Sequence, residues 1–357
     1  MKKLLLLLLA LLSGSFCHGQ HAPSPATLTA LMQKAGVPGM QLVYAKGGKV
    51  HAYALGLRTA GQSAAVNATT TFEAASLGKA VLAYVALRLA DRNVLSLDKP
   101  LLDYAPYPRL QDAPDAAKIT ARMILGHTVG LPNWAANPLS PEWKTTPLRL
   151  KYAPDSCWNY SGEGYVLLQK TLEQLTGKSF ETLAREEVFG PLGLAHSSFV
   201  WQPAFAANAA SGHDGKSLPV PINHFAEGYG AFSLLGTATD YSRFIQAVMT
   251  GRGLKPATAR LLRTPANEAS RCGQPATPAD AFIAWACGVG LDTTSRGLAQ
   301  WQWGDNGSFK GFYFTLPDQQ ESLVVFTNSA NGPRLTDDLL RLFFGPGDYH
   351  ITQWLAE

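Results

Sequence analysis

The stretch Ser76-Leu77-Gly78-Lys79 opens an apolar helical run that continues from Ala80 to Leu87. Residues three positions apart lie on one face of a helix, so this spacing puts a hydroxyl next to an amine. The first turn of a helix also offers unpaired N–H groups, which suit a developing oxyanion. A serine needs a base within reach to become nucleophilic, and a lysine in an apolar wall can lose its proton. The stretch therefore predicts a nucleophile beside a helper amine.

Ser-x-x-Lys alone arises by chance in many chains, so later motifs matter. Four further stretches follow in order: ITARMILGHTVGLP (residues 119–132), WNYSGEGY (158–165), GTATDYSRF (236–244), and NGSF (306–309) with VVFTNS (324–329) after it. With Gln302-Trp303-Gly304 they span from about Phe72 to Asn331. The chain resembles the serine β-lactamase and penicillin-binding-protein superfamily, in particular the branch related to class C β-lactamases, D,D-peptidases and family VIII esterases.

The resemblance implies an α/β (α+β) fold of the β-lactamase/transpeptidase type, in which helices flank an antiparallel sheet and a mostly helical lobe is inserted. The α/β lobe would hold residues of about 20–85 and 230–357, and the helical lobe about 86–229. Two apolar runs around Lys46-Gly47-Gly48-Lys49 predict a hairpin, because glycine suits the turn. Further predicted strands are Trp301–Trp303, Phe312–Leu316 and Ser322–Asn328, and predicted helices are Ser76–Arg92, Thr120–Leu125, Glu163–Thr176, Ser179–Glu187, Thr239–Thr250 and Leu335–Phe344. The stretch 203–227 is expected to be a long loop.

The resemblance assigns the catalytic roles. Ser76 would be the nucleophile that forms an acyl-enzyme, with Lys79 close to its oxygen. Tyr160 resembles the tyrosine that takes the serine proton and later returns it to the leaving group. Whether Lys79 or Tyr160 is the base stays open at this point. The backbone N–H groups of Ser76 and Asp305 would form the oxyanion hole.

Four residues are expected to border the substrate, namely Gly162, Gln302, Trp303 and Gly304. Gly162 stands where β-lactamases carry the Asn that binds an acylamido group, and Gln302 stands where they carry Lys or His. An uncharged amide cannot pair with the carboxylate of a β-lactam or of D-Ala-D-Ala, although Lys310 could supply a replacement cation. Trp303-Gly304 resembles related esterases, and glycine lets a substrate approach the strand closely. These departures favour an ester, a small amide or a peptide over a β-lactam.

Alternatives accompany these assignments. His127 could be catalytic, but the resemblance favours a buried, hydrogen-bonded histidine. Glu163 could be a deacylating base, but an acidic residue that stabilises the first turn of a helix is the favoured explanation. The whole protein could instead be a true class C-type β-lactamase or a D,D-carboxypeptidase acting on peptidoglycan. A non-catalytic binding protein with this fold is the hypothesis from a different class.

Residues 1–19 have the pattern of a signal peptide, with Lys2-Lys3, an apolar run from Leu4 to Leu12, and Cys17-His18-Gly19 before the cleavage point. Nine apolar residues are too few to span a bilayer, and no second long apolar run follows. We therefore expect residues 20–357 to form one exported domain, periplasmic or secreted, without a stable membrane span.

The net charge of this domain is close to zero. The full chain has 30 Lys and Arg, and without Lys2 and Lys3 the remaining 28 exceed the 26 Asp and Glu by two. This balance implies no nucleic-acid partner. The expected partner is a small-molecule or peptide substrate.

Three cysteines remain in the expected mature chain, at Cys157, Cys272 and Cys287. A Cys272–Cys287 bridge is possible in an oxidising compartment, and three separate buried thiols are the alternative. The cysteine spacing matches no metal site and the histidines are scattered along the chain. We expect neither a metal nor a cofactor.

Overall fold

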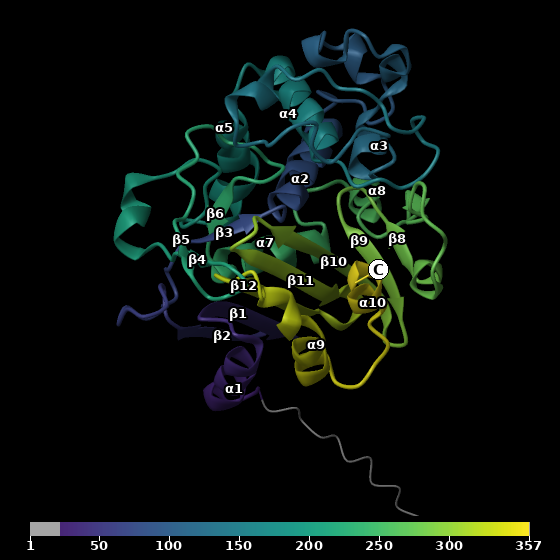
Figure 1. The fold of residues 1–357 in the computed structure, drawn as a ribbon. Coiled ribbons are helices and arrows are strands. Elements are labelled where there is room, and N and C mark those ends of the chain that lie inside the picture. The colour runs from purple at the N-terminus through teal and green to yellow at the C-terminus, as the bar shows by residue number, and fades with distance from the viewer. Residues whose placement is uncertain (1–21, 357) are drawn as a thin grey trace, which may run out of the picture.

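One antiparallel sheet joins the two ends of the chain (Figure 1). The structure, a computed structural model, describes residues 22–356, so the predicted signal peptide lies outside the described residues. In spatial order the strands are β2 (Lys49–Gly56), β1 (Gly39–Lys46), β12 (Glu321–Thr327), β11 (Lys310–Leu316), β10 (Gly297–Asp305), β9 (Gly290–Thr294), β8 (Ile283–Trp285) and β7 (Asn267–Glu268). The N-terminal hairpin pairs with the last strand through β1 and β12. The predicted antiparallel sheet and its hairpin are confirmed.

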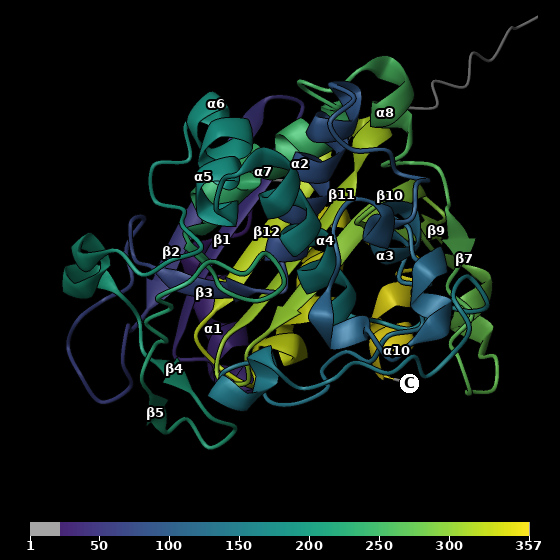
Figure 2. The ribbon, with the colours of Figure 1, turned by 90° about the horizontal axis from the view of Figure 1, so that it is seen from above.

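Helices cover both faces of this sheet (Figures 1 and 2). One face packs against the helices near the chain ends, α1 (Pro25–Ala35), α9 (Thr336–Phe344) and α10 (His350–Ala356). The other face packs against α2 (Gly78–Asp91) and α7 (Ala238–Thr250). Alternate residues of β1 point to opposite faces, so Leu42 belongs to the first core and Val43 to the second.

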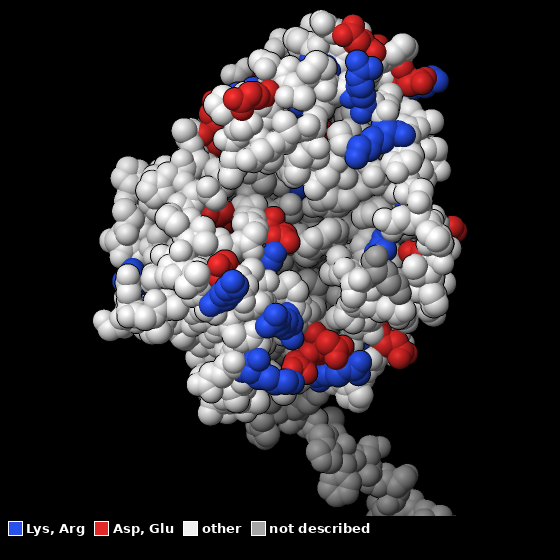
Figure 3. All heavy atoms as spheres, viewed as in Figure 1, with Lys and Arg blue, Asp and Glu red and all other residues white. Residues whose placement is uncertain are grey.

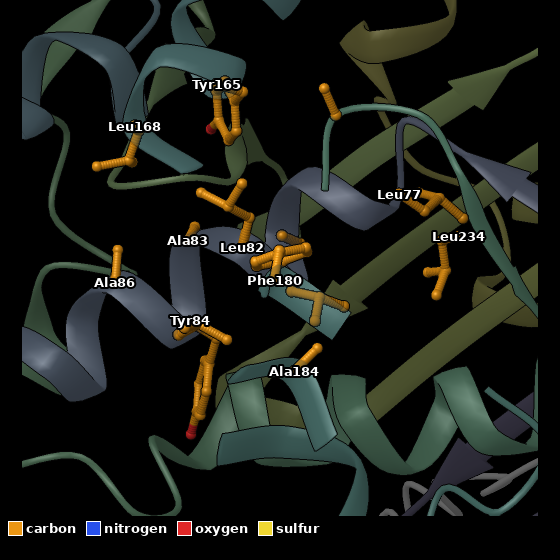
Figure 4. Close-up of a cluster of buried hydrophobic side chains, with 14 of the residues drawn as sticks. Leu77, Leu82, Ala83, Tyr84, Ala86, Tyr165, Leu168, Phe180, Ala184 and Leu234 are labelled. Carbon is orange, nitrogen blue, oxygen red and sulfur yellow. The ribbon is translucent and has the colours of Figure 1, made fainter. Parts of the chain in front are cut away.

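The remaining helices are α3 (Ala121–Leu125), α4 (Gly162–Thr176), α5 (Phe180–Ala184), α6 (Gly190–Leu192) and α8 (Pro256–Arg260). Helix α2 packs against two of them, α4 and α5. Every residue of α2 from Gly78 to Leu87 is buried, because its apolar side chains pack on all sides. Figure 4 shows Leu82 of α2 among side chains of neighbouring elements, including Leu168 and Phe180. The nearly continuous apolar sequence of this helix thus reflects its central position.

Some elements differ from the sequence predictions. The α2 helix begins at Gly78, two residues after the predicted Ser76. The expected loop 203–227 contains a short hairpin, β4 (Gly212–His213) with β5 (Pro219–Val220). Helix α1 was not predicted, although the Ser24 side chain caps its start and the chain leaves it at Gly36 with positive φ. The strands β7 to β9 are two to five residues long, too short for a clear alternation pattern.

The disulfide joins Cys157 to Cys272, so both alternatives drawn from the sequence, a Cys272–Cys287 bridge and three separate thiols, are wrong. Strand pairing explains the difference. The β7–β8 hairpin puts Asn267 opposite Trp285, and the chain then moves away from Cys287 as it approaches Cys272. An isolated β-bridge, formed by backbone hydrogen bonding between Trp158 and Arg271, instead brings Cys157 next to Cys272. Cys287 remains a buried thiol.

We predict that reduction of Cys157–Cys272 lowers the free energy of unfolding by about 2–4 kcal/mol, because this crosslink closes a long loop in the unfolded chain. The measurement is urea unfolding with and without dithiothreitol. A variant with both cysteines replaced by serine should match the reduced protein and be insensitive to the reductant. Equal stability of the oxidised and reduced proteins would contradict the prediction.

Candidate active site

The nucleophile candidate stands on a strained turn between a strand and a helix. The short strand β3 (Phe72–Ala75) pairs with β6 (Leu234–Gly236), and the pairing shifts register between Glu73 and Ala75. Ala75 adopts a φ of 52°, a left-handed conformation that costs energy for a residue with a Cβ. The turn ends β3 and places Ser76 two residues before the first residue of α2, Gly78.

Lys79 is fully buried beside that serine. Its Nζ lies 3.0 Å from Ser76 Oγ and donates to the Ala231 carbonyl oxygen at 2.7 Å. Aromatic rings surround the rest of the amine, with Nζ 4.8 Å from the ring centre of Tyr160 and 5.8 Å from that of Trp134. Within residues 22–356, no carboxylate pairs with Lys79.

Burial without a counter-ion lowers the pKa of Lys79 from 10.5 to about 7. A substantial fraction of the amine is therefore neutral near neutral pH. A neutral Nζ can accept the Ser76 proton through its lone pair while still donating to Ala231. The geometry thus allows Lys79 to act as a general base.

Tyr160 covers the same pair from the other side. Its ring stacks on the His127 ring at a centroid distance of 4.4 Å and is tilted against the Trp303 ring at 4.9 Å. The Tyr160 hydroxyl is buried and makes no hydrogen bond of good geometry within the described chain. Burial raises the pKa of Tyr160 above its ordinary value, an effect that the nearby Ser76 and Gln302 partly offset. Tyr160 is therefore a neutral phenol, a proton donor rather than a base.

His127 accepts two hydrogen bonds from the residues on either side of Tyr160. Its carbonyl oxygen accepts from the Asn159 N–H at 2.7 Å, and its Nδ1 accepts from the Ser161 N–H at 3.1 Å. Burial and the nearby charge of Lys79 hold the pKa of His127 well below its ordinary value. The imidazole is neutral and hydrogen-bonded in the interior, as the favoured interpretation of the sequence required.

The backbone N–H of Asp305 is free of the pairing between β10 and β11. Asn306 donates to the Phe309 carbonyl oxygen across the turn, and hydrogen-bonded pairs alternate along an antiparallel ladder. Asp305, opposite Lys310, is therefore a position whose N–H points away from β11. Strand β9 pairs with β10 only as far as Trp301, so this edge is open. Its position suits an oxyanion donor.

These residues border a cavity of about 410 Å³. Ser76, Tyr160, Trp303 and Asp305 line it together with Asn133, Trp134, Asn137, Pro138, Leu139, Asn223, Phe225, Phe232, Asn306 and Gly307. The structure therefore brings the predicted catalytic residues into one cleft, with Lys79 at its base beneath Ser76. In the space-filling view of Figure 3, mostly uncharged atoms border the hollow near the middle of the molecule.

Comparisons with known proteins agree with this geometry. The Beta-lactamase family matches residues 25–344. The chain belongs to this family. Penicillin-binding protein 4 of Amycolatopsis lactamdurans is 26% identical over 91% of this chain and 90% of its own. Esterase EstB of Burkholderia gladioli is 26% identical over 64% of this chain and 70% of its own.

A class C β-lactamase structure superimposes with a TM-score of 0.75 at 20% identity, covering 90% of this chain and 95% of that one. The predicted β-lactamase/transpeptidase-like fold is thereby confirmed. As a member of the β-lactamase family, the chain is a serine hydrolase.

Of the four predicted substrate-binding residues, Trp303 lines the cavity and the others lie behind its wall. Gln302 is buried and its Nε2 donates to the Ser76 carbonyl oxygen at 3.3 Å, so it supports the nucleophile's turn. A Cβ on Gly304 would lie 2.3 Å from the Ala74 carbonyl oxygen. The close approach of β3, rather than of a substrate, therefore accounts for this glycine.

Gly162 makes room for an aromatic ring of this protein. A Cβ there would lie 2.4 Å from the Trp134 ring, so tryptophan fills the space next to the glycine. Glu163, the next residue, is buried and paired through both oxygens with Arg109, and it also accepts from Trp143 Nε1 at 2.7 Å. This carboxylate anchors the loop that carries Trp134 and does not line the cavity.

Several cavity residues were missed because they lie in segments without regular structure. Asn133 and Trp134 directly follow the ITARMILGHTVGLP motif, and Asn223 and Phe225 lie in the expected loop 203–227. Asn306 belongs to a motif that was quoted for the fold. The sequence offered no signal that these amides and aromatic rings converge, because long-range packing brings them together.

We predict that Gly162→Ala lowers the free energy of unfolding by about 1–3 kcal/mol, because the added methyl group collides with the Trp134 ring. In a Trp134→Ala background the same substitution should cost much less. Urea unfolding of the four proteins in this double-mutant cycle measures the coupling. An equal cost in both backgrounds would show that Trp134 does not occupy this space.

Proposed function

We propose that this protein is an exported hydrolase that cleaves an ester, a small amide or a peptide through an acyl-enzyme on Ser76. The observation that carries the proposal is the buried Lys79 amine, which lies 3.0 Å from Ser76 Oγ and has no carboxylate partner among the described residues. The open edge at Asp305 and the phenol of Tyr160 complete a set of base, oxyanion donor and acid.

In acylation, neutral Lys79 accepts the Ser76 proton while Oγ bonds to the substrate carbonyl carbon. The backbone N–H groups of Ser76 and Asp305 bind the oxygen on which negative charge develops. When the bond to the leaving group breaks, that group takes the Tyr160 proton. The Lys79 ammonium then returns a proton to Tyr160, whose ring centre lies 4.8 Å from Nζ.

In deacylation, a water molecule replaces the leaving group and the same groups work in the opposite direction. Neutral Lys79, directly or through Tyr160, removes a proton from the water as it attacks the acyl carbon. Ser76 recovers its proton when its bond to the acyl group breaks. The product acid leaves, and no proton is gained or lost by the enzyme over the cycle.

The charges around the cleft support an ester over a β-lactam. None of the described cavity residues is a lysine or arginine. Lys310, the suggested replacement cation, forms an ion pair with the Asp305 carboxylate instead. Gln302 carries no charge, so a substrate carboxylate has no free cationic partner in the cleft.

Export is the second part of the proposal. The signal-peptide pattern at residues 1–19 supports a periplasmic or secreted protein. The Cys157–Cys272 disulfide adds support, because such bonds persist mainly in oxidising compartments. No helix among residues 22–356 has the length and apolarity needed to cross a bilayer.

We predict that a short-chain p-nitrophenyl ester is turned over while a fluorescent penicillin forms little or no adduct detectable by intact-mass spectrometry. Ser76→Ala should abolish both ester turnover and labelling by a fluorophosphonate.

A rapid Ser76-dependent penicillin adduct on the wild-type protein would favour the β-lactamase or D,D-carboxypeptidase hypothesis. A protein inert to the ester, the penicillin and the fluorophosphonate would favour the binding-protein hypothesis.

A further inference from the structure

A buried carboxylate lies behind one wall of the cleft and is not used by the mechanism. Glu73 is 1% exposed and stands on β3, three residues before Ser76. Its Oε1 accepts from the backbone N–H of Asn223 at 2.8 Å and from Asn223 Nδ2 at 3.0 Å. Its Oε2 accepts from Asn306 Nδ2 at 2.6 Å. Glu73 therefore holds two cavity residues from distant parts of the chain.

These bonds fix which way the two amides face. The Asn306 amide nitrogen also donates to the Phe232 carbonyl oxygen at 3.2 Å. Because both neighbours are acceptors, the nitrogen of this amide must face Glu73 and Phe232, and its oxygen points the other way. Asn223 is fixed in a similar way, because an ionised Glu73 carboxylate only accepts hydrogen bonds and the Asn223 amide nitrogen must therefore face it. Within the described chain, neither amide oxygen has a hydrogen-bond partner. Both half-buried residues thus leave an acceptor at the cleft.

The rest of the cleft is uncharged and aromatic. Trp134 and Trp303 line it with Phe225 and Phe232, which offer flat apolar faces. On the Trp134 side, Asn133 Oδ1 accepts from the Gly162 N–H at 3.0 Å, which leaves its Nδ2 as a donor. The cleft therefore combines fixed acceptors, a donor and aromatic faces, and its one carboxylate, that of Asp305, is paired with Lys310.

We propose that the substrate is an O-acyl ester of a neutral carbohydrate, whose hydroxyl groups donate to the amide oxygens of Asn223 and Asn306. This inference rests on the proposed ester hydrolysis and names its substrate class. The acyl group passes to Ser76, and the sugar alcohol leaves with the Tyr160 proton. Glu73 is a positioning residue that keeps the two acceptors turned toward the sugar.

Esters of other chemical classes complement the amide oxygens of Asn223 and Asn306 less well. A lipid ester has no hydrogen-bond donors, so binding it would strip water from two amide oxygens without replacement. A carboxylate-bearing substrate would bring negative charge against the same oxygens. A sugar satisfies both acceptors and also presents C–H faces to the tryptophan rings.

The test compares two acetates of the same shape, glucose acetylated on its primary hydroxyl and cyclohexylmethyl acetate. Both are primary alkyl esters, and they differ in the ring oxygen and the remaining hydroxyl groups. We expect kcat/KM for the sugar acetate to exceed that for the carbocyclic acetate by about tenfold or more, since each hydrogen bond contributes a few-fold.

Variants separate positioning from a loss of folding. In Glu73→Gln the new amide nitrogen faces Asn306 Nδ2, so Asn306 must turn and lose its acceptor at the cleft. We expect the ratio of the two kcat/KM values to fall by about threefold to tenfold. Adding Asn306→Asp gives the new amide nitrogen at position 73 an acceptor and returns an oxygen to the cleft, although the bond to the Phe232 carbonyl oxygen stays lost. The ratio should therefore recover in part. A purely structural role for Glu73 would not produce this recovery.

The outcomes distinguish this inference from the proposed function. Turnover of the carbocyclic acetate without a preference for the sugar acetate would overturn the carbohydrate assignment alone. Faster turnover of an N-acetyl amino acid ester than of the sugar acetate would also overturn it, in favour of a peptide-like substrate. An unchanged ratio in Glu73→Gln would overturn the positioning role. Failure of Ser76 to react with a fluorophosphonate would instead refute the proposed function.

Discussion

The desolvated amine of Lys79 is the interaction on which the site depends. A lysine this deeply buried usually pairs with a carboxylate, and such a partner would keep it protonated. Here the neighbours are a serine hydroxyl, a carbonyl oxygen and aromatic rings. The energetic cost of burying a charge becomes a lowered pKa, and the lowered pKa turns a cation into a base near neutral pH. The central position of α2 maintains this environment.

The surrounding structure serves to hold three segments against that amine. The register shift in β3 positions Ser76. A hydrogen bond to His127 and the disulfide hold the segment that carries Tyr160. The open edge of β10 positions the backbone N–H of Asp305. Each segment comes from a different part of the chain, so the site exists only in the folded protein. Gln302 stands where related β-lactamases carry Lys or His, and Gly162 stands where they carry Asn, yet this arrangement is intact in both places.

Local patterns predicted much of this structure. The Ser-x-x-Lys spacing, the hairpin glycines and the apolar run of α2 each express a short-range rule, and the resemblance supplied Tyr160 and Asp305. Packing between distant segments could not be deduced in this way. The pairing of Trp158 with Arg271 decided which cysteines meet, and Glu73 joins two loop amides that lie far apart in sequence. Gly162 was expected to face the substrate, but Trp134 packs against it.

Direct titration of Lys79 tests the central claim. The protein would be labelled with ¹³C at lysine Cε, and the Lys79 resonance assigned by its absence in Lys79→Arg. The account predicts an NMR titration with a pKa of about 7 and a rise of kcat/KM for an ester through the same pH range, because only the neutral amine accepts the Ser76 proton. A Lys79 pKa near 10, with ester hydrolysis already at its plateau at pH values where the amine is charged, would contradict the account.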